Sequence, residues 1–387
     1  MTEQLKINGA TFELNRYPLR NNDPLRAWDA ADEYILHHLF DNQLLDSEQR
    51  VLIVNDSFGA LSVPLSQFSP DIFGDSYISQ QSIQQNNLHN IGDTHTASFI
   101  DSTEKLDAVY DVVIFKLPKN QALLEDQLYR IKKHITAETI IIAAGMVKTV
   151  HRSTLQLFES IIGPTTTSLA RKKARLVLSH VDTALMGDTT PYPKSYQLDD
   201  YNITVVNHAN VFSRQKLDIG TRFFLENMPS NSNAKDVVDL GCGNGLLGVV
   251  YALKNPGTQL KFIDESYMAV ASARTNYEHA LDTCDNGEKG SAEFFVTDCL
   301  TDIETNSIDL ILNNPPFHQN TAVGDHVAWQ MFTESKKVLR NNGELWVIGN
   351  RHLGYHTKLK RLFGNCETVA SNQKFVLLKA RKRFSHH

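Results

Sequence analysis

Residues that build metal sites and disulfide frameworks are scarce in this sequence. Its 387 residues include only four cysteines, Cys242, Cys284, Cys299 and Cys366, and their spacing matches no metal-binding motif. The 15 histidines form no pair of ligands at helical spacing. We therefore expect reduced thiols, as in a cytoplasmic protein, and no metal site.

Long hydrophobic runs are absent too. No apolar stretch approaches the roughly 20 residues that span a membrane, and residues 1–8 lack the apolar core of a signal peptide. We therefore expect a cytoplasmic protein without a membrane partner. Neither a helix-turn-helix pattern nor zinc-finger spacing, which would indicate a reader of duplex DNA, is present. The length and the 41% apolar content suit two domains.

Positive charge is in the minority but clustered. The net charge of −6 argues mildly against a nucleic-acid partner. Four basic clusters nevertheless interrupt the acidic chain: Lys116–Lys119, Arg171–Arg175, Lys358–Arg361 and Lys379–Arg383. For any single cluster a solvated face is the simpler interpretation. Together they favour one surface that follows phosphate groups.

A glycine-rich loop follows a short apolar run in the second half of the chain. Residues 236–240 have the composition of a buried parallel strand, Gly241, Gly243 and Gly245 come next, and residues 246–254 have helical spacing. Glycine lets the backbone turn tightly and approach a ligand closely. The third glycine comes one place too early for the dinucleotide pattern. The loop resembles the D-x-G-x-G loop of class I methyltransferases instead, and a tight turn in an ordinary α/β sheet is the alternative.

Two acidic residues end the next two predicted strands. Asp264 lies 19 residues after Gly245, a spacing that suits a carboxylate accepting hydrogen bonds from both ribose hydroxyls. Asp298 ends the run 294–298 and could accept a hydrogen bond from an adenine amino group. A solvent-facing cap is the alternative for Asp298.

The predicted strand 308–313 leads directly into Asn314-Pro315-Pro316-Phe317. In open α/β sheets such loops face the ligand site, and the prolines keep the backbone extended. The Asn314 amide oxygen and the Pro315 carbonyl can then accept hydrogen bonds from one NH2 group. A purine amino nitrogen is a poor nucleophile because its lone pair is delocalised, and two fixed acceptors free that lone pair.

Phe317 would stack on the base, and a Pro-Pro turn with a buried phenylalanine is the alternative for the tetrapeptide. Beside the glycine loop, this tetrapeptide predicts methyl transfer from S-adenosylmethionine to a planar exocyclic amino group. Asn314, Pro315 and Phe317 are the candidate catalytic residues.

The first half of the chain repeats the second. Residues 51–60 take the place of the first strand and glycine loop. Three further matches pair 74–79 with 263–268, 111–118 with 309–316, and 142–145 with 347–350. We expect one fold, duplicated.

The copies differ in chemistry. Asn55 and Ser57 stand in the places of Gly241 and Gly243, where side chains would crowd a cofactor, and Lys116 replaces the amino-group acceptor. We expect a degenerate first domain that binds RNA through basic side chains. These are Lys116, Lys119, Arg171, Lys172, Lys173 and Arg175. The alternative is a domain that only stabilises the second half.

The polar, Gly- and Pro-containing stretch 182–193 predicts a boundary between a domain at 1–185 and a domain at 195–387. Residues 207–224, between a predicted hairpin and the cofactor strand, could cover the site. Phe212, Asp218 and Arg222 are the candidate lid residues.

Nearly the whole chain resembles the bacterial ribosomal RNA guanine-N2 methyltransferases with duplicated domains. Segments 207–224, 239–245 and 314–317 carry the likeness in the second half, and 55–59 with 163–167 in the first. The first half most resembles the members that act on 23S RNA, and those that act on 16S RNA are the closest competitors.

The resemblance implies two tandem Rossmann-like class I methyltransferase domains, each α/β, the first degenerate. It also implies a seven-stranded sheet that ends in an antiparallel hairpin at 368–370 and 375–380. The donor would be S-adenosylmethionine, the partner ribosomal RNA, and the target one guanine; we expect a monomer. Cofactor contacts would fall to Asp239, Gly241, Gly243, Gly245, Asp264 and Asp298, and amino-group activation to Asn314 and Pro315.

Other substrates stay open. The N-P-P-[FY] loop also serves adenine-N6 DNA methyltransferases and enzymes that methylate protein glutamine, since each activates a planar nitrogen. A basic extra domain favours RNA, where an unpaired or flipped guanine would suit the site. An RNA-binding assembly factor with a vestigial methyltransferase half is a further alternative. The intact loops at 239–245 and 314–317 oppose it.

Overall fold

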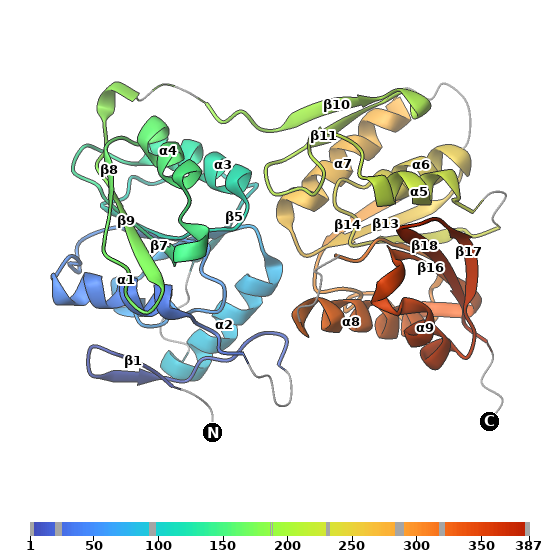
Figure 1. Ribbon diagram of the computed structural model, residues 1–387, viewed down its shortest axis with the longest axis horizontal. Coiled ribbons are helices and arrows are strands. Elements are labelled where there is room, and N and C mark those ends of the chain that lie inside the picture. Colours follow the sequence, from blue (N-terminus) through green and yellow to red (C-terminus); the bar gives the residue numbers. More distant parts are fainter. Residues whose placement is uncertain are drawn as a thin grey trace. The chain divides into compact units, whose positions relative to one another are not determined.

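The computed structural model describes residues 4–19, 25–92, 98–185, 187, 189–229, 233–282, 290–316 and 322–383. The chain divides into two compact units, Met1–Tyr192 and Pro193–His387. In each unit, helices cover both faces of one sheet (Figure 1).

The first domain opens on a small hairpin and continues as an α/β sheet. Its sheet order is β5-β4-β3-β6-β7-β9-β8, and only β8 and β9 form antiparallel pairs. Its elements are β1 (Leu5–Ile7), β2 (Ala10–Phe12), α1 (Ala30–Asp41), β3 (Val51–Val54), β4 (Asp71–Gly74), α2 (Tyr77–Ile91), β5 (Ser98–Asp101), β6 (Val112–Lys116), α3 (Gln121–Ile131), β7 (Ile140–Met146), α4 (Arg152–Ile161), β8 (Thr165–Thr167) and β9 (Ala174–Ser179).

The second domain has the same plan. Its order, β14-β13-β12-β15-β16-β18-β17, corresponds strand for strand to that of the first domain. Its elements are β10 (Lys194–Leu198), β11 (Ile203–Asn207), α5 (Ile219–Glu226), β12 (Asp236–Leu240), α6 (Leu246–Lys254), β13 (Gln259–Asp264), α7 (Tyr267–Asp282), β14 (Ser291–Val296), β15 (Ile308–Asn313), α8 (Ala322–Val338), β16 (Leu339–Asn350), α9 (Tyr355–Phe363), β17 (Glu367–Ser371) and β18 (Phe375–Arg381). The predicted duplication, the seven strands and the closing antiparallel hairpin are confirmed.

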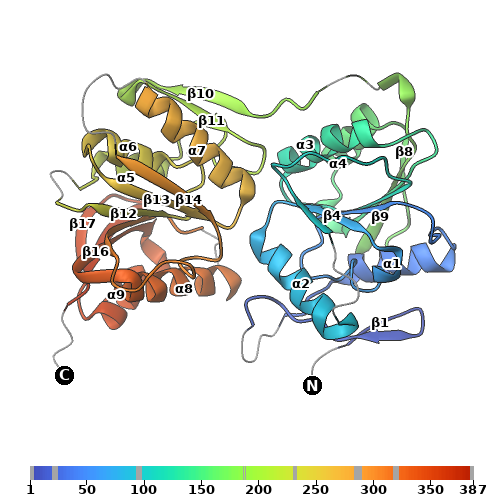
Figure 2. The same cartoon turned by 180° about the vertical axis from the view of Figure 1, so that it is seen from behind.

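The central strands are apolar on both faces because helices cover both. In β15, Leu310 and Leu312 pack into the cluster that contains α5, α6 and α7, whereas Ile311 packs into the cluster of α8 and α9. Figure 2 shows these two helix layers from behind. Burying each such side chain stabilises the fold by roughly 1.5–3 kcal/mol. This two-sided burial holds the carboxyl ends of β12, β13 and β15 in one row.

Backbone hydrogen bonds define which residues of the two copies are equivalent. The Asn55 amide donates to the Phe73 carbonyl at 2.9 Å, as the Gly241 amide does to Ile263 at 2.8 Å. The predicted equivalence of Asn55 and Gly241 is therefore confirmed. The registers of β6 on β3 and of β15 on β12 then make Lys116 equivalent to Asn314.

Two predicted matches are wrong by a single residue. Residues 74–79 were matched to 263–268, but the registers of β4 on β3 and of β13 on β12 make Gly74 equivalent to Asp264, not to Ile263. Residues 142–145 were matched to 347–350, which would make Gly145 equivalent to Asn350. In the strand registers, Phe115 pairs with Ala143, and its equivalent Asn313 pairs with Val347. Gly145 is therefore equivalent to Gly349. Each glycine lies under the loop that follows: a Cβ would come within 2.7 Å of Thr149 at Gly145 and within 2.6 Å of Tyr355 at Gly349.

Two of the four basic clusters belong to the ordinary surface of the second domain. In α9, Tyr355, Leu359 and Phe363 form the buried stripe, so residues 358–361 lie mainly on the solvent side. In β18, Lys379 pairs with Glu367 at 2.9 Å. We therefore interpret both clusters as solvated, ion-paired surface, the simpler of the two interpretations.

Candidate functional site

The glycine loop connects β12 to α6 with three left-handed residues. Gly241, Gly243 and Gly245 have φ of +66°, +55° and +77°, a region that favours glycine. A Cβ on Gly245 would lie 2.8 Å from that of Ala273, whereas a Cβ on Gly243 would meet nothing within 4 Å. Gly243 therefore borders open space, as the prediction of close ligand approach requires.

Asp264 lies beside this loop at the carboxyl end of β13. Its carboxylate accepts hydrogen bonds from the Gly243 amide at 2.9 Å and the Ser266 amide at 3.1 Å. Burial raises the pKa of this carboxyl group. Each carboxylate oxygen offers about two lone-pair sites. Asp264 can therefore hold the loop and still accept hydrogen bonds from ribose hydroxyls.

Asp239 caps a helix from inside the sheet. Only 1% of the residue is exposed, and Oδ2 accepts a hydrogen bond from the Gly248 amide at 2.8 Å. That amide lies in the first turn of α6, where it lacks an intrahelical acceptor, and the N-cap residue Gly245 has no side chain to supply one. Burial, reinforced by the negative charge of Asp264, raises the pKa of Asp239 to about 8. A cofactor contact for Asp239 stays a prediction.

Asp298 is buried at the end of β14, with 5% of its surface exposed. Its Oδ1 accepts a hydrogen bond from Gln330 Nε2 of α8 at 3.1 Å. The alternative of a solvent-facing cap is therefore wrong. The carboxylate lies on the same edge of the sheet as Asp264, because β14 pairs in parallel with β13.

Asn314 directly follows β15, next to the glycine loop of the neighbouring strand β12. Its Nδ2 donates to Thr221 Oγ1 at 3.1 Å. Its Oδ1 is buried and has no hydrogen-bond partner among the residues that the structure describes. Leaving such an acceptor unsatisfied is costly, which points to a donor on a ligand. Pro315 is buried, and Phe317 lies outside the described residues.

The predicted lid segment contributes a helix cap. Asp218 is the N-cap of α5 and accepts a hydrogen bond from the Thr221 amide at 2.9 Å. Arg222 forms an exposed ion pair with Asp200 at 3.3 Å, and Phe212 is 65% exposed. Thr221, which contacts Asn314, was not among the predicted residues. The Asp-x-x-Thr spacing of a helix start is the signal that could have found it.

Asn276 of α7 joins the entry hairpin to the glycine loop. Its Oδ1 accepts a hydrogen bond from the Val206 amide at 2.7 Å, and its Nδ2 donates to the carbonyls of Val206 and Asn244, both at 2.9 Å. Asn244 also donates from Nδ2 to Asn207 at 3.0 Å. The start of the segment 207–224 is thereby attached to the cofactor loop.

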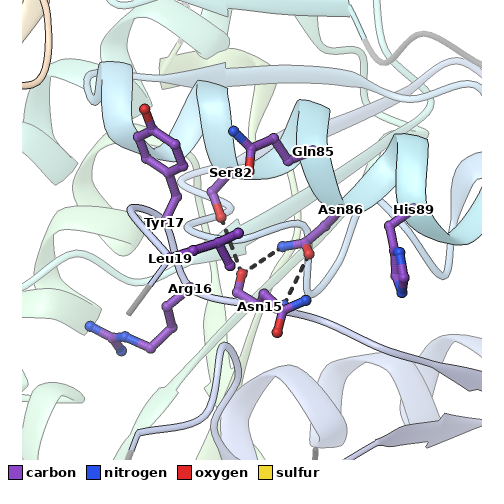
Figure 3. Close-up of a pocket in the computed structure, with 8 residues that line it drawn as sticks. All are labelled: Asn15, Arg16, Tyr17, Leu19, Ser82, Gln85, Asn86 and His89. Atoms are coloured by element: carbon purple, nitrogen blue, oxygen red, sulfur yellow. Dashed lines mark hydrogen bonds between the residues drawn. The ribbon is translucent and has the colours of Figure 1, made fainter. Parts of the chain in front are cut away.

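The first domain repeats this arrangement around Asn86 of α2. The Asn15 amide donates to Asn86 Oδ1 at 2.9 Å, and Asn86 Nδ2 donates to the carbonyls of Asn15 and Phe58, both at 2.7 Å. Figure 3 shows the Asn15–Asn86 contacts beside a pocket. The duplication therefore includes the entry hairpin, which sequence comparison of the halves had missed.

The first domain has lost the other parts of the site. Gly74 occupies the position of Asp264, and the Asn55 amide group bonds with Gln127 of α3. Asp56 Oδ2 accepts a hydrogen bond from the Ser62 amide at 2.8 Å, which replaces the cap that Asp239 supplies in the second domain. In the first domain, hydrogen bonds from its own side chains, Asn55 and Asp56, therefore hold the loop in place.

Lys116 is ion-paired within the first domain. Its ammonium group lies 2.6 Å from Asp29 and 2.7 Å from Asp32, and its side chain is 18% exposed. Burial alone would lower the pKa of Lys116, but the charges of Asp32 and Asp29 raise it. An RNA contact for Lys116 stays a prediction, and these ion pairs oppose it, because the buried Asp32 and the partly exposed Asp29 neutralise the cation. Lys119, in contrast, is exposed.

The cluster Arg171–Arg175 forms the turn between β8 and β9. Arg171, Lys172 and Lys173 are exposed, and Arg175 is partly buried. Lys172 and Lys173 both have positive φ, 47° and 64°, inside the tight turn that the bridge from Arg171 to Ala174 closes. The hairpin thus ends in three cationic side chains.

Within the described part of the chain, no group of three His, Cys, Asp or Glu side chains could hold a metal ion. No helix there is long and apolar enough to cross a membrane. Burial raises the pKa of Cys242 well above the ordinary range, which suits a small packing residue rather than a nucleophile.

A seven-stranded sheet with a glycine loop after its first strand and Asn-Pro-Pro after its fourth defines a class I S-adenosylmethionine-dependent methyltransferase domain. The families described as "RLMG N-terminal domain" and "Methyltransferase small domain" match residues 2–183 and 202–379. The chain belongs to the ribosomal RNA large subunit methyltransferase G family.

Similar proteins extend over almost the whole chain. A ribosomal RNA large subunit methyltransferase G of Aeromonas salmonicida is 49% identical over 370 residues, covering 96% of this chain and 97% of the relative. One of Streptomyces griseus is 46% identical over 379 residues, with the same coverage of 96% and 97%. The solved T. thermophilus 16S rRNA N2 methyltransferase RsmC, in complex with AdoMet and guanosine, matches with a TM-score of 0.76 at 20% identity, covering 98% of both chains. At 20% identity, this structural similarity to RsmC shows the fold alone.

The titration of Asp239 should govern how pH affects the stability of the second domain. A folded-state pKa of about 8 lies above the unfolded value of roughly 3.9. The folded state then binds the extra proton between these values, so stability falls as pH rises from about 4 to about 8.

Asp239→Asn keeps an acceptor for the Gly248 amide but does not titrate. Urea unfolding at pH 5, 7 and 9 should show a flatter pH dependence for this variant than for wild type. Glu226→Gln, at an exposed position, is the control; equal slopes for wild type and Asp239→Asn would contradict the prediction.

Removal of the Lys116 ammonium should destabilise the first domain. Lys116→Met leaves the buried Asp32 carboxylate without its cation, which should lower the free energy of unfolding by about 3 kcal/mol. The exposed lysine in Lys105→Met provides the control. RNA affinity measured below the unfolding transition should not change, and a selective loss of RNA affinity would support Lys116 as an RNA ligand.

Proposed function

We propose that this protein transfers the methyl group of S-adenosylmethionine to the exocyclic N2 amino group of a guanine in 23S ribosomal RNA. The observation that carries the proposal is the buried, unpartnered Oδ1 of Asn314 at the end of β15, beside the glycine loop. The large-subunit substrate is supported by the names of relatives 45–49% identical to the chain.

The residues present fit S-adenosylmethionine. Gly243 borders open space, which leaves room for a ligand against the loop backbone. Asp264 has lone pairs left for ribose hydroxyls, and Asp298 lies one strand further for an adenine amino group. When bound, the cofactor supplies an electrophilic methyl group on a sulfonium.

The chain contributes acceptors and orientation. Asn314 Oδ1 and the Pro315 carbonyl accept the two hydrogens of the guanine amino group, so the nitrogen lone pair is held out of conjugation and directed at the methyl carbon. Neither residue takes a proton: as the bond to the methyl carbon forms and the carbon–sulfur bond breaks, the extra proton of the methylated nitrogen passes to water. Their effect is positioning together with preorganised electrostatics.

The turn at Lys172 and Lys173 supports an RNA-binding function for the first domain. Two-residue hairpin turns with positive φ at both positions strongly prefer Asn-Gly. Lysine in this left-handed conformation costs roughly 1–2 kcal/mol per residue. Cations placed at such a cost, next to Arg171, suit contacts with phosphate groups. Lys172 also pairs with Glu33 at 2.8 Å, but its side chain stays 68% exposed.

The central test is a tritium-methyl transfer assay with protein-free 23S RNA, protein-free 16S RNA and intact subunits from a strain lacking this protein. We expect label in 23S RNA, recovered as N2-methylguanosine. Asn314→Ala should lower turnover by about 10²-fold, by analogy with the loss of one oxyanion-type group, while cofactor affinity stays near wild type.

Three results would contradict the proposal, two from this assay extended to DNA and protein glutamine and one from a titration with S-adenosylmethionine. Label in 16S RNA would overturn the substrate. Label only in DNA or protein glutamine would overturn the RNA assignment. Absence of S-adenosylmethionine binding at 1 mM, roughly the weak end of useful affinity, would exclude the methyltransferase and favour an RNA-binding assembly factor.

Replacing the two turn lysines should separate stability from RNA binding. In Lys172→Asn/Lys173→Gly the turn receives its preferred residues, so the first domain should unfold at higher urea concentration. The loss of two cations should weaken RNA binding and reduce the salt slope by roughly 1.5–2. The double variant Lys105→Asn/Lys133→Asn removes two exposed charges elsewhere in the same domain. An unaltered salt slope in the turn variant would exclude the hairpin as an RNA contact.

A further inference from the structure

The amide group of Asn314 must have a defined orientation to act as an acceptor. An asparagine amide turned by 180° would direct NH2 instead of oxygen at the substrate amino group, and two donors would then face each other. Asn314 Oδ1 is the buried, unpartnered end, and Nδ2 is the end that Thr221 holds. The contact with Thr221 therefore decides which end faces the site.

The Thr221 hydroxyl can hold this orientation only if its own proton is directed elsewhere. A hydroxyl has one proton to donate and can accept at its lone pairs. Thr221 Oγ1 donates to Asp218 Oδ2 at 3.4 Å, and the same carboxylate oxygen accepts from the Thr221 amide at 2.9 Å. The Asp218 carboxylate can only accept, so it draws the hydroxyl proton towards itself. Thr221 Oγ1 is then left with lone pairs that accept from Asn314.

We propose that Thr221 and Asp218 are positioning residues of the methyl-transfer site. Asp218 orients the hydroxyl of Thr221, and Thr221 orients the amide of Asn314 so that its oxygen faces the target amino group. This inference rests on the proposed function, because it concerns the same acceptor. It assigns a role to the start of α5, where the sequence had indicated only a lid.

The first domain supports this assignment independently. Asp29 is the N-cap of α1 as Asp218 is of α5, and Asp32 follows Asp29 at the spacing at which Thr221 follows Asp218. Both carboxylates contact Lys116, the equivalent of Asn314. In both copies the first turn of this helix therefore holds the residue at the end of the fourth strand.

The chemistry of the contact differs between the copies in the way the proposal requires. In the first domain an ammonium group faces two carboxylates, and lysine has no acceptor to offer a substrate. In the second domain Thr221 is neutral and takes only the NH2 end of Asn314. The oxygen is left available, and an amino-group donor can bind it.

The test compares Thr221→Val with Thr221→Ser. Valine preserves the shape but removes the hydroxyl, so the amide loses its orientation and kcat for guanine methylation should fall about tenfold, the effect of one lost hydrogen bond. KM for RNA and the affinity for S-adenosylmethionine by calorimetry should stay within twofold of wild type. Serine restores the hydroxyl and should restore kcat to within about threefold.

A double-mutant cycle separates positioning from a structural effect. In the Asn314→Ala background no amide remains to be oriented, so Thr221→Val should cause no further loss of kcat. Additive losses, or wild-type turnover in Thr221→Val, would overturn the positioning role while the proposed function stands. A wild-type protein without methyl transfer to any RNA would contradict the proposed function itself. Urea unfolding of each variant identifies one that fails to fold, and Thr221→Ser then carries the comparison.

Discussion

The hydrogen bond from Asn314 Nδ2 to Thr221 Oγ1 joins residues 93 positions apart, and the candidate chemistry of this protein depends on it. It ties the end of a central strand to the first turn of a helix, and it leaves the opposite end of the amide group buried and unpartnered. An acceptor in that state is unfavourable in isolation, and in the proposed mechanism it binds the amino-group donor of the substrate, because the cost of burial is already present. The sheet order, which puts β15 beside β12, brings this acceptor next to the glycine loop.

The two domains show how one framework accommodates different chemistry. In both domains a carboxylate accepts a hydrogen bond from a backbone amide just after the loop that follows the first strand of the sheet. Asp239 reaches the Gly248 amide in the first turn of α6 from within the sheet, whereas Asp56 reaches the Ser62 amide from the loop itself. Both domains attach the entry hairpin to the loop through an asparagine of the following helix. The hydrogen bonds that support the fold are therefore similar in the two domains. The positions proposed to face a ligand differ, because the first domain has Gly74 in place of Asp264 and Lys116 in place of Asn314.

Much of the site could be predicted because its residues follow one another along the chain. The glycine loop, the acid at the end of β13 and Asn-Pro-Pro are each local motifs attached to a strand, and parallel strands bring their carboxyl ends together. Sequence reasoning was least informative where a property depends on distant neighbours. Lys116 is a cation in any sequence comparison, but Asp29 and Asp32 neutralise it from another element. Thr221 went unnoticed because a helix-cap motif carries no sign of the strand that it contacts. The match of 142–145 failed because both halves contain similar apolar runs, which a shift of one residue preserves.

The sequence by itself determined the duplicated α/β architecture and the chemistry of a planar amino group, since apolar strand runs, positive-φ glycines and a rigid Asn-Pro-Pro segment have few structural alternatives. Only the tertiary structure decided which polar groups are satisfied. Among the residues that the structure describes, Asn314 Oδ1 has no hydrogen-bond partner, whereas the Lys116 ammonium contacts Asp29 and Asp32. The physical reason is that hydrogen bonding and charge neutralisation depend on which side chains the packed sheet and helices bring within about 3 Å, and this proximity is not encoded in any one segment.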